Sequence, residues 1–131
     1  LPIEYKSPVS SAQVKSSILL AGLSSLGKTT VIEPTLSRDH TERMLKFFGA
    51  KISTHELDDM SWEITLEGIP ELKPLDLSIP ADPSSAAFPI ISAIITPNSN
   101  IKVENVCINE LRTGLYKTLI EMGANIQFFN D

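Results

Sequence analysis

A short polar segment at the start of an apolar run has the composition of an anion-binding helix N-terminus. Ser10, Ser11 and Gln13 supply two hydroxyls and an amide, and within about one turn the segment to Leu23 becomes almost wholly apolar. Ser10, followed three residues later by Gln13, matches a capping box and predicts a helix over about 11–23. Free backbone N–H groups and a partial positive charge at such an end can hold an anion. The residues alone leave two interpretations open: a cap only, or a cap that also binds.

Arg38 is the cation best suited to assist such a site. Ser37 is a suitable N-cap for a second predicted helix over about 38–48, and this places Arg38 in the first turn. The helix dipole disfavours a cation there. We therefore expect Arg38 to meet either a nearby carboxylate, from Asp39 or Glu42, or a bound anion that accepts two N–H bonds.

Other reactive side chains have simpler explanations. His40 has no evident nucleophile partner and is interpreted as a surface or capping residue. The acidic pair at 58–59 indicates a turn. Asp82, which opens the segment 82–85, is interpreted as a helix cap. Cys107 has apolar neighbours and is interpreted as a small core residue rather than a nucleophile.

Residues 22–29 match the phosphate-loop pattern G-x-x-x-x-G-K-[ST]. That loop requires a strand before it and a helix after it, because loop amides and the helix N-terminus converge on phosphate. Here a helix precedes, and the β-branched segment 28–33, typical of a strand, follows. We interpret the match as accidental. A nucleotide hydrolase would instead be stabilised by ATP, and mutation of Lys28 would abolish that effect.

The composition limits the class of protein. The chain has 131 residues, 42% hydrophobic and 21% charged, which is typical of one soluble globular domain. Its net charge of −5 argues against nucleic-acid binding. The apolar run 86–95 is too short to cross a bilayer. A single cysteine cannot form an internal disulfide, and together with two scattered histidines it does not make a metal site. This cysteine usage is compatible with the cytoplasm, where we expect the protein. Because the chain begins at Leu1 without Met, we expect a piece of a longer protein.

The order of predicted elements starts over near residue 71. The first copy reads as an extended segment, helices over 11–23 and 38–48, and strands over 28–33, 51–57 and 62–68. The second reads as strands over 75–79, 101–104 and 125–129, a helix from 82–85 to about 95, and a helix from Asn109 or Glu110 to Gly123. Matching residues lie 74 positions apart: Ser11 and Ser85, Arg38 and Arg112, Leu45 and Leu119, Gly49 and Gly123. We predict one domain of two repeats, about 1–70 and 71–131, with the second truncated.

Alternating helices and strands predict an α/β (α+β) fold with helices packed on mixed sheets. The helices over 11–23 and 82–95 are apolar on most faces and are expected to be central. Those over 38–48 and 110–123 carry charged faces and are expected nearer the surface. If rotation relates the repeats, their Ser-rich helix N-termini point the same way and form a polar face suited to a phosphorylated small molecule.

Four segments, in this order, resemble the family of 3-phosphoshikimate 1-carboxyvinyltransferase (EPSP synthase). They are 11–16 (Ser-Ala-Gln-Val-Lys-Ser), 30–34 with 37–42 (Ser-Arg-Asp-His-Thr-Glu), 82–88 (Asp-Pro-Ser-Ser-Ala-Ala-Phe) and 112–114 (Arg-Thr-Gly). The Ser-Ala-Gln form resembles that of bacterial members. The resemblance spans nearly all of the chain, but only about the middle part of such an enzyme. It implies repeated βαβαββ units, three in each of two domains that close on substrate, in an enolpyruvyl transferase-like fold.

The resemblance also implies a function. The enzymes transfer the enolpyruvyl group of phosphoenolpyruvate to the 5-hydroxyl of shikimate 3-phosphate, through a tetrahedral intermediate, in aromatic amino-acid biosynthesis. Neither a metal nor an organic cofactor is implied. Carried over, the residues that bind shikimate 3-phosphate are Ser11, Ala12 through its backbone, Gln13 and Arg38. Ser11 and the helix amides would hold phosphate, Gln13 would reach the substrate, and Arg38 would supply charge.

The resemblance places the chemistry outside this sequence. The family's acid/base carboxylate, its catalytic Lys and the Arg residues that clamp phosphoenolpyruvate belong to other parts of the enzyme. We therefore expect no catalytic residue here, a fragment that is inactive alone, and the remaining domain of the same enzyme as its partner, with neither nucleic acid nor membrane.

Two alternatives share the fold. One is the related enolpyruvyl transferase that acts on a UDP-sugar. The other is a non-catalytic binding or scaffold module, which a parent chain without acid/base carboxylates outside this segment would favour.

Overall fold

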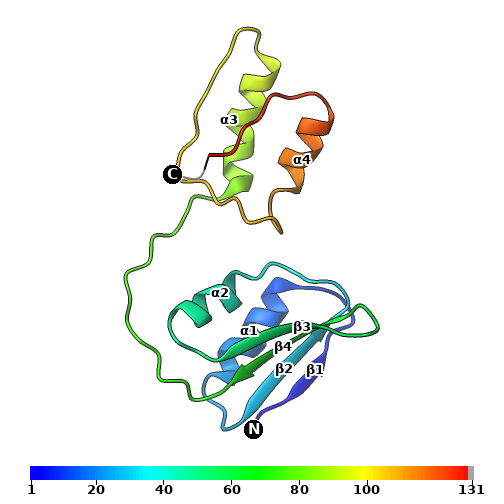
Figure 1. Cartoon of the computed structure of the whole chain (residues 1–131), viewed down its shortest axis with the longest axis vertical. Coiled ribbons are helices and arrows are strands. Elements are labelled where there is room, and N and C mark those ends of the chain that lie inside the picture. The colour runs from blue at the N-terminus through cyan, green and yellow to red at the C-terminus, as the bar shows by residue number, and fades with distance from the viewer. Residues whose placement is uncertain (130–131) are drawn as a thin grey trace. The chain divides into compact units, whose positions relative to one another are not determined.

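The computed structural model describes residues 1–129 of the chain. The chain divides into two compact units, Leu1–Asp76 (unit 1) and Leu77–Asp131 (unit 2). Unit 1 contains helices and a mixed sheet, so the α/β prediction is confirmed (Figure 1). The grouping of two repeats, about 1–70 and 71–131, into one domain stays a prediction.

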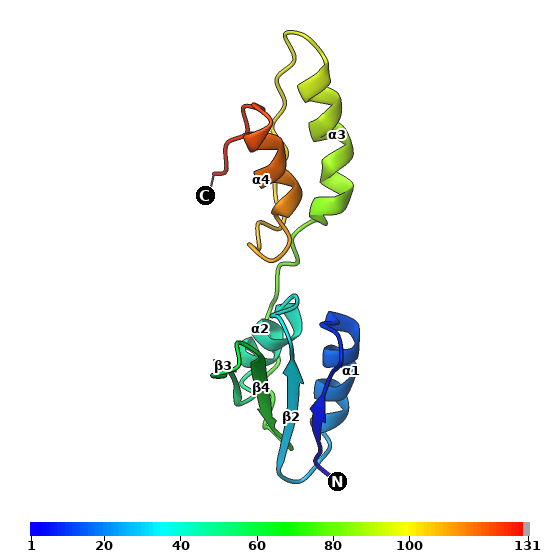
Figure 2. The same cartoon turned by 90° about the vertical axis from the view of Figure 1, so that its right-hand side faces the viewer.

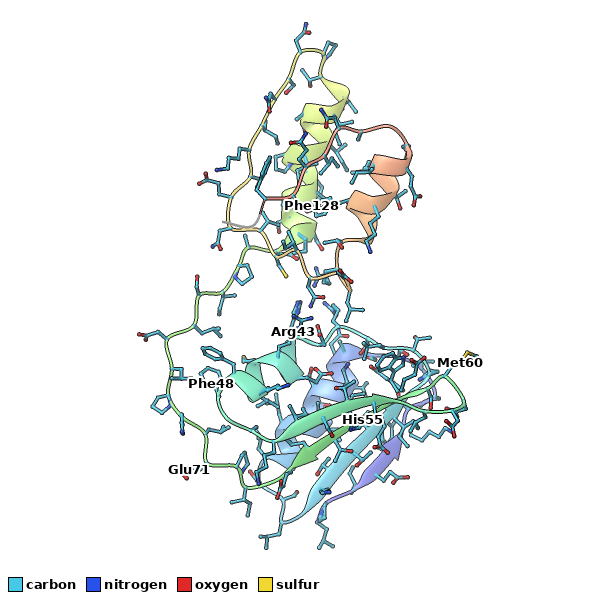
Figure 3. The ribbon with its side chains drawn as sticks, in the orientation of Figure 1. Arg43, Phe48, His55, Met60, Glu71 and Phe128 are labelled. Atoms are coloured by element: carbon cyan, nitrogen blue, oxygen red, sulfur yellow. The ribbon has the colours of Figure 1, made fainter. Side chains whose placement is uncertain are left out.

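Unit 1 is a four-stranded sheet with two helices (Figure 1, Figure 2). Its elements are β1 Glu4–Lys6, α1 Ala12–Gly22, β2 Lys28–Glu33, α2 His40–Phe47, β3 Ile52–Glu56 and β4 Trp62–Glu67. The strand order is β1-β2-β4-β3. The strand β1 runs parallel to β2, since α1 crosses between them, and the other pairs are antiparallel. The predicted strand over 28–33 and the predicted hairpin are confirmed; Met60 lies in the hairpin loop, with φ +64° (Figure 3).

One face of the sheet carries the hydrophobic core. Alternate residues of β2, namely Thr29, Val31 and Glu33, are buried, as the two-residue period of a strand requires. The buried cluster joins both helices to the sheet and comprises Leu19, Val31, Leu45, Ala50, Ile64 and Leu66. The residues between them on β2 lie on the other face, where the hydroxyls of Thr30 and Thr65 are 2.9 Å apart.

The C-terminal end of α1 packs tightly on β2. Gly22 is buried, and a Cβ added there would lie 2.8 Å from Thr29 Oγ1 and 2.9 Å from Thr29 Cβ. Both distances are shorter than 3.0 Å, a separation that real Cβ atoms essentially never show. The absence of a side chain at Gly22 therefore allows the close approach of helix and strand.

Helix α1 is capped one residue later than the capping-box pattern predicts. Its N-cap is Ser11, whose Oγ accepts a hydrogen bond from the Val14 amide at 3.4 Å. The hydroxyl of Ser10 instead donates to the Thr35 carbonyl at 2.6 Å. The prediction that Ser10 caps the helix is wrong because its hydroxyl bonds instead to Thr35, in the loop after β2.

Helix α2 begins at His40, two residues later than predicted. Its N-cap is Asp39, whose side chain makes no capping bond. The predicted cap, Ser37, donates its amide to Glu33 Oε1 at 2.8 Å. Ser37 is therefore held by the end of β2, and Arg38 precedes the helix instead of standing in its first turn.

Unit 2 contains the helices α3 Pro83–Ile95 and α4 Gly114–Glu121. Asp82 caps α3 as predicted, since its Oδ2 accepts a hydrogen bond from the Ser85 amide at 3.2 Å. Pro at the first position suits a helix start. The Tyr116 hydroxyl of α4 donates to the Pro83 carbonyl at 2.7 Å, and this bond joins the two helices. The Tyr116 ring also lies 6.0 Å from that of Phe128 (Figure 3).

Helix α4 begins at Gly114, not at Asn109 or Glu110. The Asn109 side chain accepts a hydrogen bond from the Leu111 amide at 3.0 Å, and its carbonyl accepts one from the Arg112 amide at 2.7 Å. These bonds close a turn, which uses the hydrogen bonds that a helix cap would need.

The predicted strands over 75–79, 101–104 and 125–129 do not form. Among the described residues, unit 2 has one parallel bridge, between Ala81 and Val106. An alternating sequence makes a strand only where a neighbouring backbone pairs with it. In unit 1 both β2 and β3 pair with β4, and positions 74 residues after β4 lie beyond residue 131. The predicted last strand was expected to continue through 130–131, which lie outside the described residues.

The second helices of the two units match at a spacing of 74 residues. The bounds of α2 and α4 differ by that number at both ends. Gly49 and Gly123, which follow these helices, have φ +98° and +97°. The next amides, of Ala50 and Ala124, each bond to the carbonyl five residues earlier at 2.9 Å. Both helices thus end in the same glycine-dependent way.

Helices α1 and α3 are less buried than predicted. Helix α1 buries one side, including Leu19, and leaves Leu20 48% exposed. On α3, Phe88 is 77% and Ile95 is 74% exposed. Within each unit these helices pack on one side only, so they are not central. No helix in the described part of the chain is long and apolar enough to span a membrane.

Candidate anion-binding site

An open depression of about 230 Å³ lies in unit 1, beside the N-terminal part of α1 and the start of α2. It is lined by Ala12, Gln13, Ser16, Arg38, His40 and Thr41. Three of the four predicted site residues, Ala12, Gln13 and Arg38, therefore meet in one place. The fourth, Ser11, is the N-cap next to Ala12 and does not itself line the depression.

The surroundings favour a negatively charged ligand. The first turn of α1 contains no acidic residue, so nothing on the helix offsets the positive end of its dipole. The lining supplies the exposed amide of Gln13, the Arg38 guanidinium and two hydroxyls, those of Ser16 and Thr41, which lie 2.7 Å apart. No carboxylate lines the depression.

Arg38 reaches the depression from the loop between β2 and α2, so the argument from the dipole of α2 no longer applies. Both carboxylates expected to pair with it are engaged elsewhere. Asp39 Oδ2 lies 2.6 Å from Nε of Arg43, which extends from α2 away from the sheet (Figure 3). Glu42 Oε1 lies 2.7 Å from Lys15 Nζ. Across residues 1–129, Arg38 forms no ion pair, and this favours the interpretation that it meets a bound anion.

The other candidate groups have structural roles. Asp59 Oδ1 accepts a hydrogen bond from the Ser61 amide at 3.0 Å. The Ser61 hydroxyl, followed by that amide, lowers the pKa of Asp59 below its ordinary value of 3.8, as expected of a turn. In the 22–29 segment, Gly22 ends α1 and Lys28 begins β2, so the phosphate-loop geometry is not made. The described chain contains no group of three His, Cys, Asp or Glu residues that could hold a metal.

A buried ion cluster in unit 1 was not predicted from the sequence. Lys15 Nζ lies 2.9 Å from Glu33 Oε1 and 2.7 Å from Glu42 Oε1, and the Lys15 and Glu33 side chains are 1% exposed. A signal was available. Lys15 precedes Leu19 by one turn on the buried side of α1, and Glu33 continues the inward series of β2. A lysine and a glutamate at such positions predict a buried ion pair.

The sequence model of one family matches residues 2–130: EPSP synthase (3-phosphoshikimate 1-carboxyvinyltransferase). The 3-phosphoshikimate 1-carboxyvinyltransferase of Parvibaculum lavamentivorans is 55% identical over 130 residues, which is 99% of this chain and 29% of that protein. The protein of the same name from Afipia carboxidovorans is 57% identical over 127 residues, which is 97% of this chain and 29% of its length. The chain thus spans less than a third of these relatives.

Solved structures give the same result. An EPSP synthase from Acinetobacter baumannii superposes with a TM-score of 0.83 and 45% identity, covering 95% of this chain and 27% of that one. A second structure of EPSP synthase from that organism gives 0.82 at the same identity and coverage. The family match over nearly the whole sequence, the relatives more than half identical and the shared fold together show that this chain belongs to the EPSP synthase family.

Proposed function

We propose that this chain is part of a 3-phosphoshikimate 1-carboxyvinyltransferase and supplies part of its shikimate 3-phosphate site. The complete enzyme would transfer the enolpyruvyl group of phosphoenolpyruvate to the 5-hydroxyl of shikimate 3-phosphate and release phosphate. Family membership supports the reaction, and the single observation that supports the site is the depression joining the start of α1 to Arg38.

The predicted residues that line the depression have roles that fit their positions, and Ser11 lies next to them as the N-cap. The first-turn amides of α1 and the Ser11 hydroxyl would face the phosphate of the substrate, where the helix dipole favours negative charge. The Arg38 guanidinium would neutralise part of that charge with paired N–H bonds. Gln13 is exposed on the first turn and would donate to a substrate oxygen. The depression is open, so these contacts would cover only one side of the ligand.

The chain alone would bind weakly and would not turn over. The lining contains neither a carboxylate nor a lysine, so acid/base groups and contacts to phosphoenolpyruvate would come from the rest of the enzyme. Closure of that remaining domain over the site would exclude water and complete the enclosure. We also propose that 1–70 and 71–131 are two repeats of one domain, supported by the 74-residue spacing, and that the enzyme is cytoplasmic.

The deciding experiment uses the full-length protein with phosphoenolpyruvate and either shikimate 3-phosphate or a UDP-sugar, with release of inorganic phosphate as the readout. We expect release with shikimate 3-phosphate only. Turnover of the UDP-sugar alone would assign the protein to the related transferase. Binding of either compound without any turnover would favour a non-catalytic module of the same fold.

A further inference from the structure

The buried ion cluster of unit 1 lies directly behind the loop that carries Arg38. Lys15, Glu33 and Glu42 come from α1, β2 and α2, and none is more than 7% exposed at its side chain. Two carboxylates around one ammonium in a dry interior are costly unless their geometry is fixed, and such groups are a weak source of net stability. The cluster therefore needs an explanation other than stability.

Ser37 is the residue that the cluster holds most completely. Its amide donates to Glu33 Oε1 at 2.8 Å, and its hydroxyl lies 2.8 Å from Glu33 Oε2. Its carbonyl accepts a hydrogen bond from Lys15 Nζ at 3.3 Å. That carbonyl belongs to the peptide group that joins Ser37 to Arg38. The backbone entering Arg38 is thus fixed by the end of β2 and by a side chain of α1.

Two hydroxyl contacts hold the chain on either side of this tether. The Ser10 hydroxyl, just before α1, lies 2.8 Å from that of Thr35, and its Oγ also accepts a hydrogen bond from the Thr35 amide at 3.0 Å. The hydroxyls of Ser16 on α1 and Thr41 on α2 form the second contact. Residues 35–41 are therefore attached to the segment 10–16 at three successive points.

Lys15 is surrounded by oxygen atoms of the protein. Its Nζ donates hydrogen bonds to Glu33 Oε1 and to the Ser37 carbonyl, and it forms an ion pair with Glu42 Oε1 at 2.7 Å. With 1% of its side chain exposed, Lys15 acts on the depression only through the residues that it holds.

We infer that Lys15 and Glu33 are positioning residues, which set the placement of Arg38 relative to the first turn of α1. The inference rests on the proposed function, because it assigns these residues to the same shikimate 3-phosphate site. A guanidinium recognises phosphate through a fixed pair of N–H groups, so a small displacement of the loop separates it from an anion held by the helix amides.

The test is a double-mutant cycle in the full-length protein. Glu33→Gln replaces the carboxylate with a neutral amide of similar shape, and is made alone and together with Arg38→Ala. Calorimetry with shikimate 3-phosphate gives the affinity, and hydrogen exchange of the Ser37 amide reports the tether. We expect Glu33→Gln to weaken binding about tenfold when Arg38 is present and less than about twofold when it is absent, with faster exchange at Ser37. Lys15→Met, if the variant folds, should show the same Arg38-dependent loss of affinity and the same faster exchange at Ser37.

A matched control separates positioning from general destabilisation. Thr30→Val removes a half-buried hydroxyl contact on the opposite face of the same strand and should lower thermal stability without changing affinity. Equal losses of affinity for Glu33→Gln with and without Arg38, or no loss at all, would overturn the inference. Unchanged affinity in Arg38→Ala, with exchange at Ser37 still faster in Glu33→Gln, would instead refute the proposed role of Arg38 and leave the tether standing.

Discussion

The start of α1 with Arg38 and the start of α3 with Arg112 are corresponding regions with opposite electrostatics. The two arginines lie 74 residues apart, and each lies just before the second helix of its unit. Arg112 Nη2 lies 2.7 Å from Asp82 Oδ1 and donates to Ser84 Oγ at 2.9 Å. Arg38 has no such acid, because the cap of α1 is the neutral Ser11.

This difference in charge arises from three additional residues at the start of α3, Pro83 to Ser85. In the 74-residue frame, Ala12 corresponds to Ala86, yet α3 begins at Pro83. The extra residues supply almost one more turn, with Asp82 as its cap. The Asp82 carboxylate accepts a hydrogen bond from a helix amide and also forms an ion pair with Arg112. Unit 2 therefore contains its own anion beside Arg112, whereas the corresponding place in unit 1 is an open depression without a carboxylate in its lining.

The largest expected effect comes from giving unit 1 the acid of unit 2. Ser11→Asp keeps an N-cap of about equal strength, so the free energy of unfolding should change by less than about 0.5 kcal/mol. The new carboxylate would pair with Arg38 and repel phosphate, and affinity for shikimate 3-phosphate should fall by several kcal/mol. Calorimetry on the full-length protein measures this loss. Ser17→Asp, which adds the same charge at an exposed position farther along α1, should have little effect. Equal losses in both variants would contradict the site.

Removing the arginines one at a time should separate the two regions. Arg38→Ala in the full-length protein should weaken shikimate 3-phosphate binding by about 1.5–3 kcal/mol, the range for hydrogen bonds to a charged group. Arg112→Ala should leave the affinity unchanged, since its partners are Asp82 and Ser84. Titration calorimetry of the two variants side by side provides the measurement. A larger loss from Arg112→Ala would place the site in unit 2.

Gln13→Ala should have a smaller effect, about 1 kcal/mol of binding free energy for one hydrogen bond. The cap of α1 is Ser11, so Gln13 is not needed for it and the melting temperature should be unchanged. Substrate titration and thermal melts of the full-length protein test both expectations. A lower melting temperature with unchanged affinity would return Gln13 to a structural role in the cap.

The smallest effect concerns acid titration of unit 2. The Ser84 amide holds the pKa of Asp82 below its ordinary value of 3.8 against the opposing effect of desolvation, and the amide and hydroxyl of Ser85 and the charge of Arg112 lower it further. A lowered folded-state pKa means that the ionised carboxylate contributes stability above pH 3.8, and that this is lost as the pH falls through the lower value. NMR of the full-length protein should show the Ser85 amide signal moving with that titration. Asp82→Asn should abolish the movement, and a signal that still moved would assign it to another acid.

The two regions also show what the sequence can predict. The strand β2, the hairpin and the bounds of α3 follow from local signals: β-branched residues, alternation around a turn, and an Asp-Pro start. The predicted start of the 38–48 helix failed because the Ser37 amide bonds to Glu33 and the Ser37 carbonyl to Lys15. The contact with Lys15 joins residues 22 positions apart, which no local pattern contains. The strands predicted in unit 2 also failed because of distant contacts, since an alternating segment forms a strand only where another strand pairs with it.

That the predicted residues bind a ligand stays a prediction, and the structure shows only which of them lie together. The polar start of α1 and Arg38 carry recognisable chemistry, and the structure brings Ala12, Gln13 and Arg38 to one depression. Lys15 and Glu33 were missed because a charged residue is assumed to face solvent unless its place in the periodic pattern is checked. Burial of both follows from the packing of α1 on β2, a tertiary event.

The tight contact at Gly22 gives that packing a mechanical consequence. Helix α1 rises about 1.5 Å per residue, so Ala12 at its other end is about 15 Å away. A rigid helix pushed off β2 at Gly22 would tilt about its buried contacts at Leu19 and Lys15, and its N-terminal amides would shift relative to Arg38. Gly22, which lies outside the depression, thus helps to set the angle at which α1 presents its amides.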